Sequence, residues 1–431
     1  MFNKLLVANR GEIAVRIINE CKQLGIKTVA ICSEIERATL HMKIADEGYC
    51  IGAAPIKDSY MNAGAIINAA LITKTDVIHP GYGFLSEDKG FAKACKKNNI
   101  MFVGPLSDTL AQLGDKIEAK NIASAQHIPI LPGRLVKDID EALLLADKIG
   151  YPVILKICDG GGGSGIIPAF NVDELKKAFN VLQTSKSVQL LIEKYVEKTR
   201  HIEVQIMADQ HGNIITLGNR ECSIQLDNKK VLEECPAQNL SAELMEKLYT
   251  DSIKLTRAVN YVGVGTMEFL VDEEENYYFI EMNARIQVEH GITEMITGMN
   301  LVQWQIKIAV GEKIPFTQED IILSGHALEC RINAQSCGQV ESWQLNNREA
   351  RFDHAIVNGI TVTPYYYAMI GKLIAHGQTR SDAIGKMNRY LNNLHINGIK
   401  TNIDLHKNIL SNSNFLNSVY YTDFLIKEGY V

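Results

Sequence analysis

Hydrophobic and polar residues alternate along the first part of the chain in blocks that predict strands and helices. The apolar segment KLLVAN is followed by the amphipathic segment GEIAVRIINECKQLG and then by the apolar segment KTVAIC. An amphipathic run that ends at glycine, between two apolar runs, is typical of a strand–helix–strand unit. The alternation continues through DVIHPGYGFLSE and IMFVGP. We therefore predict a parallel α/β sheet domain over residues 1–113.

From about residue 114, short strands and hairpins replace this alternation. The segment DKIEAKNIASAQ predicts a helix, and GVGTMEFLVDEEENYYFIEMN predicts a hairpin. In HIEVQIMAD, alternation gives one apolar face and one polar face, the latter formed by His201, Glu203 and Gln205. A last region mixes short strands with the helix SDAIGKMNRYLNNL. We predict α+β structure in two further domains, over residues 114–324 and 325–431.

A run of four glycines stands out in the segment ILKICDGGGGSGI, residues 154–166. Glycine lets the backbone lie close to a ligand and point its N–H groups at anionic oxygens. The flanks YPVILKI and GIIPAF predict strands, and a helix capped by Asn171, with Glu174 in the capping-box position, follows. This context favours a flap over a linker between domains, although the loop alone is equally consistent with a plain hairpin. It matches neither the Walker A motif nor the dinucleotide fingerprint.

Composition narrows the class of protein. The 431 residues are 46% hydrophobic and 22% charged, which is ordinary for a globular protein. No apolar stretch is long enough to span a bilayer, and charge comes too early for a signal peptide, so we expect a cytoplasmic protein. Nine cysteines without CxxC spacing suggest neither disulfides nor a zinc site. A net charge of −6 gives no reason to expect nucleic acid or membrane as a partner.

The predicted hairpin GVGTMEFLVDEEENYYFIEMN contains the first candidate metal-binding residues. Its two strands bring Glu268 and Glu281 to a similar height, with Asn283 next to them. Carboxylate and amide oxygens in this arrangement are suited to Mg²⁺ held jointly with phosphates. The alternative is a solvated sheet face.

The segment NARIQVEHG follows directly, and there Arg285 can grip a small planar anion while Glu289 acts as a base. The alternative is a surface ion pair. Lys116, Lys156 and Lys194 are each ordinary lysines when taken alone. Combined with the glycine flap and the carboxylate pair, they favour a phosphate-transfer site.

These segments, together with ANRGEIAVRI, HPGYGFLSE, KKVLEECPA and GIKTNIDL, resemble the biotin carboxylase family of ATP-grasp enzymes over nearly the whole chain. The resemblance implies an N-terminal α/β domain, a central ATP-grasp domain with a glycine-rich lid at about residues 131–203, and a C-terminal α+β domain. It implies that bicarbonate and MgATP form carboxyphosphate, which then N-carboxylates biotin on a carrier protein. A biotin carboxyl carrier protein, a carboxyltransferase and a homodimer are the implied partners.

The resemblance also implies roles for individual residues. The implied nucleotide-binding residues are Lys116, Lys156, Gly161, Gly162, Gly163, Glu193, Lys194, Val196, His201, Gln225, Leu270 and Glu281. The implied ligands of Mg²⁺ or Mn²⁺ are Glu268, Glu281 and Asn283. The implied bicarbonate site comprises Lys230, Arg285, Gln287, Val288 and Glu289, of which Lys230, Arg285 and Glu289 are catalytic and Glu289 is the base.

Several positions depart from the family pattern, most of them around the acceptor. The family's Arg-Arg-His-Gln-Lys is replaced by residues 226–230, LDNKK, and the arginine of the flap is Ser164. The nearest match to the arginine that stabilises the biotin enolate is Ser342, with Lys229 or Arg348 as possible substitutes, and PYYD ends in Tyr367. We therefore expect weak carboxylation of free biotin. A different nitrogen acceptor and a non-catalytic nucleotide-binding paralogue remain as alternatives.

Overall fold

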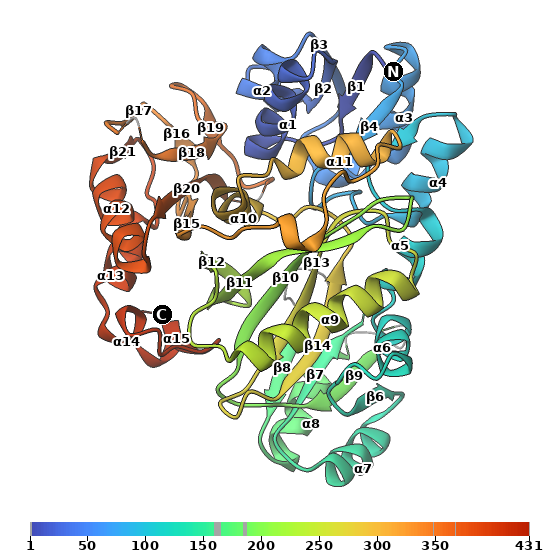
Figure 1. Cartoon of the computed structure of the whole chain (residues 1–431), viewed down its shortest axis with the longest axis vertical. Coiled ribbons are helices and arrows are strands. Elements are labelled where there is room, and N and C mark those ends of the chain that lie inside the picture. The colour runs from blue at the N-terminus through green and yellow to red at the C-terminus, as the bar shows by residue number, and fades with distance from the viewer. Residues whose placement is uncertain (1, 159–164, 184–187, 348, 367, 431) are drawn as a thin grey trace.

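The computed structural model describes residues 2–158, 165–183, 188–347, 349–366 and 368–430 (Figure 1). The N-terminal part is a five-stranded parallel sheet in the order β3-β2-β1-β4-β5. Its strands are β1 (Lys4–Val7), β2 (Lys27–Ser33), β3 (Glu47–Gly52), β4 (Val77–His79) and β5 (Met101–Phe102). Its helices are α1 (Gly11–Gln23), α2 (Leu40–Ile44), α3 (Ala63–Ile72), α4 (Lys89–Lys97) and α5 (Ser107–Gly114). The predicted parallel α/β sheet is confirmed.

A small antiparallel sheet, at the bottom of Figure 1, lies within the segment predicted as the lid and is called the lid below. Its strands, in the order β6-β9-β7-β8, are β6 (Gly133–Val136), β9 (Leu190–Lys194), β7 (Val153–Ile157) and β8 (Ile166–Ala169). Helices α7 (Ile139–Ile149) and α8 (Val172–Leu182) pack on it. The predicted start of α8 is confirmed, because the Asn171 side chain accepts a hydrogen bond from the Glu174 amide at 3.0 Å.

The largest sheet has eight strands in the order β14-β13-β10-β11-β12-β15-β20-β18, all paired antiparallel. They are β10 (Arg200–Ala208), β11 (Ile214–Leu226), β12 (Lys229–Cys235), β13 (Gly263–Val271), β14 (Tyr277–Asn283), β15 (His326–Asn333), β18 (Arg351–His354) and β20 (Met369–Gly377). The predicted hairpin is the β13–β14 pair. This one sheet runs from the central region into the C-terminal region.

Further helices cover the large sheet and complete the C-terminal region. They are α6 (Lys116–Ala125), α9 (Ala242–Ala258), α10 (His290–Thr297), α11 (Leu301–Ala309), α12 (Arg380–Asn393), α13 (Ile403–Ser411), α14 (Ser413–Leu416) and α15 (Phe424–Lys427). Two short strand pairs, β16 (Gly338–Gln339) with β19 (Thr361–Val362) and β17 (Ser342–Leu345) with β21 (Leu394–Asn397), lie beside them.

The large sheet separates an apolar core from a polar face. The apolar side chains of β10, including Ile202 and Val204, are fully buried in a cluster with Leu248 and Leu255 of α9. Burial of such side chains contributes about 1.5–3 kcal/mol each. The opposite face of the same strands carries the polar residues described next. Among the described residues, no helix is long and apolar enough to cross a membrane.

Candidate active site

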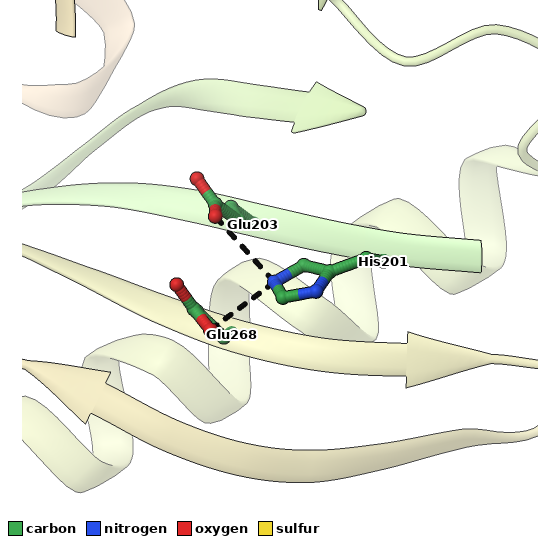
Figure 2. A group of neighbouring side chains, drawn as sticks. All are labelled: His201, Glu203 and Glu268. Atoms are coloured by element: carbon green, nitrogen blue, oxygen red, sulfur yellow. Dashed lines mark ion pairs between the residues drawn. The ribbon is translucent and has the colours of Figure 1, made fainter. Parts of the chain in front are cut away.

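Two carboxylates and one imidazole lie close together on the polar face of β10 and β13 (Figure 2). Glu203 and Glu268 lie opposite each other in register. His201 Nε2 is 3.1 Å from Glu268 Oε2 and 3.5 Å from Glu203 Oε1. Strand alternation placed Glu203 on the same face as His201, but Glu203 received no role in the sequence analysis because one strand does not reveal its neighbours.

The β13–β14 register places Glu281 directly opposite Glu268, so both carboxylates face the same space. The Asn283 side-chain amide donates to Glu268 at 2.9 Å and to Glu281 at 3.4 Å. Burial, and then the neighbouring Glu268 carboxylate, raise the pKa of Glu281. A carboxylate in this situation is stabilised by an added cation. The hard oxygen donors of Glu268, Glu281 and Asn283 therefore fit Mg²⁺ or Mn²⁺.

Lys230 lies at the centre of the acidic cluster. Its Nζ donates to Glu268 at 2.9 Å, to Glu289 at 2.8 Å and also to Glu203. A tight turn positions it, because Asp227 and Asn228 have φ values of 49° and 58° and connect β11 directly to β12. Burial disfavours its charge, but Glu268 and Glu289 outweigh that effect and raise the pKa of Lys230.

Glu289 has a second cationic neighbour in Arg331 of β15. The Arg331 guanidinium donates to Glu289 Oε2 at 3.0 Å and to Glu233 Oε1 at 2.5 Å. Burial favours the protonated acid, but Lys230 and Arg331 hold the pKa of Glu289 well below its ordinary value. Glu289 is therefore a carboxylate able to receive a proton.

The position that the sequence analysis matched to the acceptor-site arginine lies in another strand than Arg331. The sequence analysis assigned the place of the family's acceptor-site arginine to Ser342, which has no formal charge. Ser342 lies in β17, and its hydroxyl accepts a hydrogen bond from Asn397 at 2.9 Å. Arg331, to which the sequence analysis gave no role, supplies a positive charge beside Glu289. Arg348 and Tyr367 lie outside the described residues.

A buried arginine holds the cluster in place from behind. Arg220 is fully buried and donates to Glu203 at 2.9 Å and to Gln287 at 3.2 Å. Gln287 in turn donates to Glu268 at 2.7 Å. Sequence reasoning gave Arg220 no role, because its contacts come from three separate segments.

The remaining predicted bicarbonate residues border this cluster. Arg285 donates to Glu87 at 2.8 Å and to the Asn283 side-chain oxygen at 2.7 Å, so it lies beside the carboxylate pair. The Val288 carbonyl accepts a hydrogen bond from Lys372. Lys230 donates hydrogen bonds to both Glu268 and Glu289, and Gln287 donates to Glu268. These bonds connect Lys230, Gln287 and Glu289 in one network.

Lysines gather at the lid side of the site. Lys156 of β7 is 2.8 Å from Glu193 of β9, and Lys120 of α6 forms an ion pair with the same carboxylate. Burial, and then Lys116, lower the pKa of Lys156 to about 8. Burial, and then Lys156 and Lys116, lower the pKa of Lys120 to about 7. Mutual repulsion of this kind favours a bound anion. Lys120 was missed, although it lies one helical turn after Lys116.

Other predicted nucleotide residues fall into two groups. Gln225 donates to His201 Nδ1 at 3.1 Å, and Leu270 lies opposite His201 in register. Lys194 instead donates to the carbonyl oxygens of Gly150 and Tyr151, at 3.0 and 3.1 Å, and lines a cavity that Val196 also lines. Gly161, Gly162, Gly163 and Ser164 lie outside the described residues.

Comparison with known proteins identifies the class. Residues 1–110 match the family model for the biotin carboxylase N-terminal domain, and residues 329–427 match that for the biotin carboxylase C-terminal domain. Residues 115–317 match the model for the carbamoyl-phosphate synthase L chain ATP-binding domain. The fold and this match define an ATP-dependent ligase of the ATP-grasp type.

Individual relatives match this chain over nearly its full length. Biotin carboxylase 1 of Bacillus subtilis is 44% identical, over 99% of this chain and 98% of that protein. The crystal structure of the biotin carboxylase domain dimer of Hydrogenobacter thermophilus 2-oxoglutarate carboxylase, in complex with MgADP, ADP and bicarbonate, has a TM-score of 0.96 and 43% identity, and covers 100% of this chain and 98% of that chain. A Campylobacter jejuni biotin carboxylase structure also has a TM-score of 0.96, with 40% identity over 99% of both chains. The chain belongs to the biotin carboxylase family.

Proposed function

We propose that this chain uses MgATP to activate bicarbonate and then carboxylates biotin carried on another protein. The observation that carries the proposal is the buried arrangement of Glu289 between Lys230 and Arg331, at 2.8 and 3.0 Å. It keeps Glu289 ionised as a base and gathers cations where a small anion would be held.

The lysine cluster on the lid side is assigned to the nucleotide. Lys120 and Lys156 share the carboxylate partner Glu193, and both are repelled by Lys116 and by each other. Phosphate oxygens would relieve that repulsion. Glu268, Glu281 and Asn283 would hold Mg²⁺ or Mn²⁺, which supplies positive charge to the phosphate oxygens during transfer.

The bicarbonate is assigned to Lys230, Arg285, Gln287, Val288 and Glu289. Glu289 accepts the bicarbonate proton, and the resulting oxygen attacks the γ-phosphate to give carboxyphosphate and ADP. Arg285 presents a planar fork of donors that suits a planar anion. Carboxyphosphate then breaks down to CO₂ and phosphate, and the phosphate takes the proton from the biotin ureido nitrogen. Arg331 stabilises the negative charge that this deprotonation places on the ureido oxygen, and the nitrogen then attacks CO₂.

One observation favours a second candidate acceptor. Residues 226–229, which replace the family's usual basic residues, form the turn immediately before Lys230. A changed turn beside the site is consistent with a different nitrogen acceptor. A non-catalytic paralogue is disfavoured, because the base, its two cationic partners and the carboxylate pair are all present.

The proposed partners follow from the relatives. The Hydrogenobacter relative is named as the small subunit of a 2-oxoglutarate carboxylase, and its biotin carboxylase domain was solved as a dimer. We propose that this chain forms a homodimer in the cytoplasm and works with a biotin carboxyl carrier protein and a carboxyltransferase.

The test combines ATP cleavage with fixation of radiolabelled bicarbonate. The wild-type chain should cleave ATP in a bicarbonate-dependent manner and fix label onto a biotinylated carrier domain. Arg331→Met should lower label fixation about 10²-fold, the usual cost of losing one such donor. Arg331→Lys is the matched control, and it should recover part of the rate because it restores the charge. Label fixed on another amine but not on biotin would favour the second acceptor, and absence of bicarbonate-dependent ATP cleavage would contradict the enzyme assignment.

A further inference from the structure

A buried carboxylate that has no part in the proposed reaction lies next to Arg331. It belongs to Glu233 of β12, which is fully buried. The Arg331 Nε donates to Glu233 Oε1 at 2.5 Å, while the Arg331 Nη2 donates to Glu289 Oε2 at 3.0 Å. A guanidinium is planar and rigid, so bonds from two of its nitrogens to two carboxylates fix both its position and the direction of its plane. Glu233 therefore restrains the cation to which the acceptor is assigned.

The next residue of β12 serves the opposite face of the strand. Successive side chains of a strand point to opposite faces of the sheet. Glu234 is also fully buried, and its carboxylate accepts hydrogen bonds from His326 at 2.6 Å and from Arg380 of α12 at 2.7 Å. The two buried glutamates of β12 are thus divided between the faces, and Glu233 is the one on the face of Arg331.

The position of Glu233 is unfavourable for a carboxylate. Glu329 of β15 is also fully buried and lies directly opposite Glu233 in register, so two acids share one face. Among the described residues, Glu233 Oε2 has no hydrogen-bond partner. Burial raises the pKa of Glu233, Arg331 opposes this effect, and Glu289 adds to it. A carboxyl whose pKa is raised by folding makes the fold less stable at neutral pH. Stability therefore gives no reason for an acid at this position.

We propose that Glu233 is a positioning residue for the carboxylation step and that it acts through Arg331. The inference rests on the proposed function, in which Arg331 stabilises charge on the biotin ureido oxygen. A donor is effective in this role only when it is held in place before the charge develops. Glu289 loses its negative charge when it accepts the bicarbonate proton, so its attraction for Arg331 weakens while it holds that proton. Glu233 takes no part in that proton transfer and keeps Arg331 in place.

A double-mutant cycle on the full chain tests this inference, with fixation of radiolabelled bicarbonate onto the biotinylated carrier domain as the readout. Glu233→Met removes the acceptor of the Nε hydrogen bond, and it should lower fixation about tenfold, because a small displacement of a donor slows the reaction. Glu233→Gln keeps an accepting oxygen and should stay within about threefold of the wild type. In an Arg331→Met background, Glu233→Met should lower fixation by less than about twofold more, because the residue through which it acts is absent.

Two further measurements separate positioning from a purely structural role. Bicarbonate-dependent ATP cleavage without biotin and the KM for MgATP should stay near their wild-type values in Glu233→Met, because neither involves the acceptor. Glu234→Gln is the matched control on the opposite face. It should lower the temperature of thermal unfolding, because it weakens a buried ion pair, and yet leave fixation unchanged. Glu233→Asp withdraws the carboxylate by one carbon and should lower fixation severalfold, so it serves as the test if Glu233→Met does not fold.

The outcomes distinguish this inference from the proposed function. Equal losses from Glu233→Met in the wild-type and Arg331→Met backgrounds would show an effect independent of Arg331 and would overturn the inference. Unchanged fixation in both Glu233→Met and Glu233→Asp would also overturn it, while the proposed function would stand. Absence of label fixation by the wild-type chain would overturn the proposed function, and the inference with it.

Discussion

At the scale of single residues, the site has an acid-rich half and a base-rich half. Glu203, Glu268 and Glu289 surround Lys230 in the first half, while Lys120 and Lys156 compete for Glu193 in the second. The buried acids need cations and the crowded lysines need an anion. In a magnesium–nucleotide complex, the divalent cation would stabilise the buried acids and the negative phosphates would stabilise the crowded lysines.

The lowered pKa of Lys156 leads to a prediction about pH. In the free protein Lys156 loses its proton as pH rises through about 8, because burial and Lys116 disfavour its charge. A bound phosphate favours the charged form and raises that pKa. Nucleotide binding at pH 8 should therefore take up about half a proton at this site, and affinity should fall as pH rises above 8.

Titration of MgADP in two buffers with different ionisation enthalpies measures this uptake. Lys156→Met should reduce it, while Lys177→Met, at an exposed lysine of α8, should leave it unchanged. Identical binding heats in both buffers for the wild-type chain would contradict the prediction.

At the scale of elements, the lid depends on close contact between β6 and β9. A Cβ atom added at Gly133 would lie 2.4 Å from the Ile192 carbonyl oxygen and 2.7 Å from Glu193 Cγ. Such contacts are shorter than any normal packing distance, so one of the strands must move. One of these two strands, β9, carries Glu193, the ion-pair partner of Lys120 and Lys156.

We therefore expect Gly133→Ala to destabilise the lid by about 1–3 kcal/mol and to weaken nucleotide binding. Hydrogen exchange of the β9 amides, followed by mass spectrometry, measures the first effect, and titration with MgADP measures the second. Gly64→Ala in α3 is the control, because its nearest atom would be at an ordinary 3.5 Å. Equal protection of β9 in the wild type and in Gly133→Ala would refute this account of the lid.

At the scale of the whole molecule, Tyr366 joins the C-terminal region to the N-terminal sheet. Its hydroxyl bonds to Ser33 and donates to the Ala54 carbonyl at 2.9 Å. Its ring lies 4.4 Å from the Arg10 guanidinium carbon. Residues more than three hundred positions apart in the sequence therefore meet here.

Tyr366→Phe keeps the ring and removes the hydroxyl, so it should lower the free energy of unfolding by about 1–2 kcal/mol. Urea denaturation followed by circular dichroism measures the change. Tyr365→Phe alters a neighbouring ring that is 48% exposed, and it should change stability by much less. If the two variants were equally stable, the interdomain bonds of Tyr366 would contribute nothing.

Local patterns in the sequence were sufficient for several features of the fold and the site. The Asn171 cap, the β13–β14 hairpin and the buried face of β10 depend on residues close together in the chain. The hairpin also brings Glu281 opposite Glu268, after an irregularity between Glu268 and Phe269 that shifts the register by one residue.

Contacts between distant segments were decided only by tertiary structure. Arg331 reaches Glu289 because β15 joins the large sheet beside β12, and Lys120 of α6 pairs with Glu193 of β9, which is far from it in the sequence. Strand order across a sheet is set by packing of whole elements, which no local periodicity encodes. The sequence by itself therefore determined the elements, the family resemblance and the hairpin carboxylates. The charge balance around Glu289 exists only where chain segments from three regions are brought together.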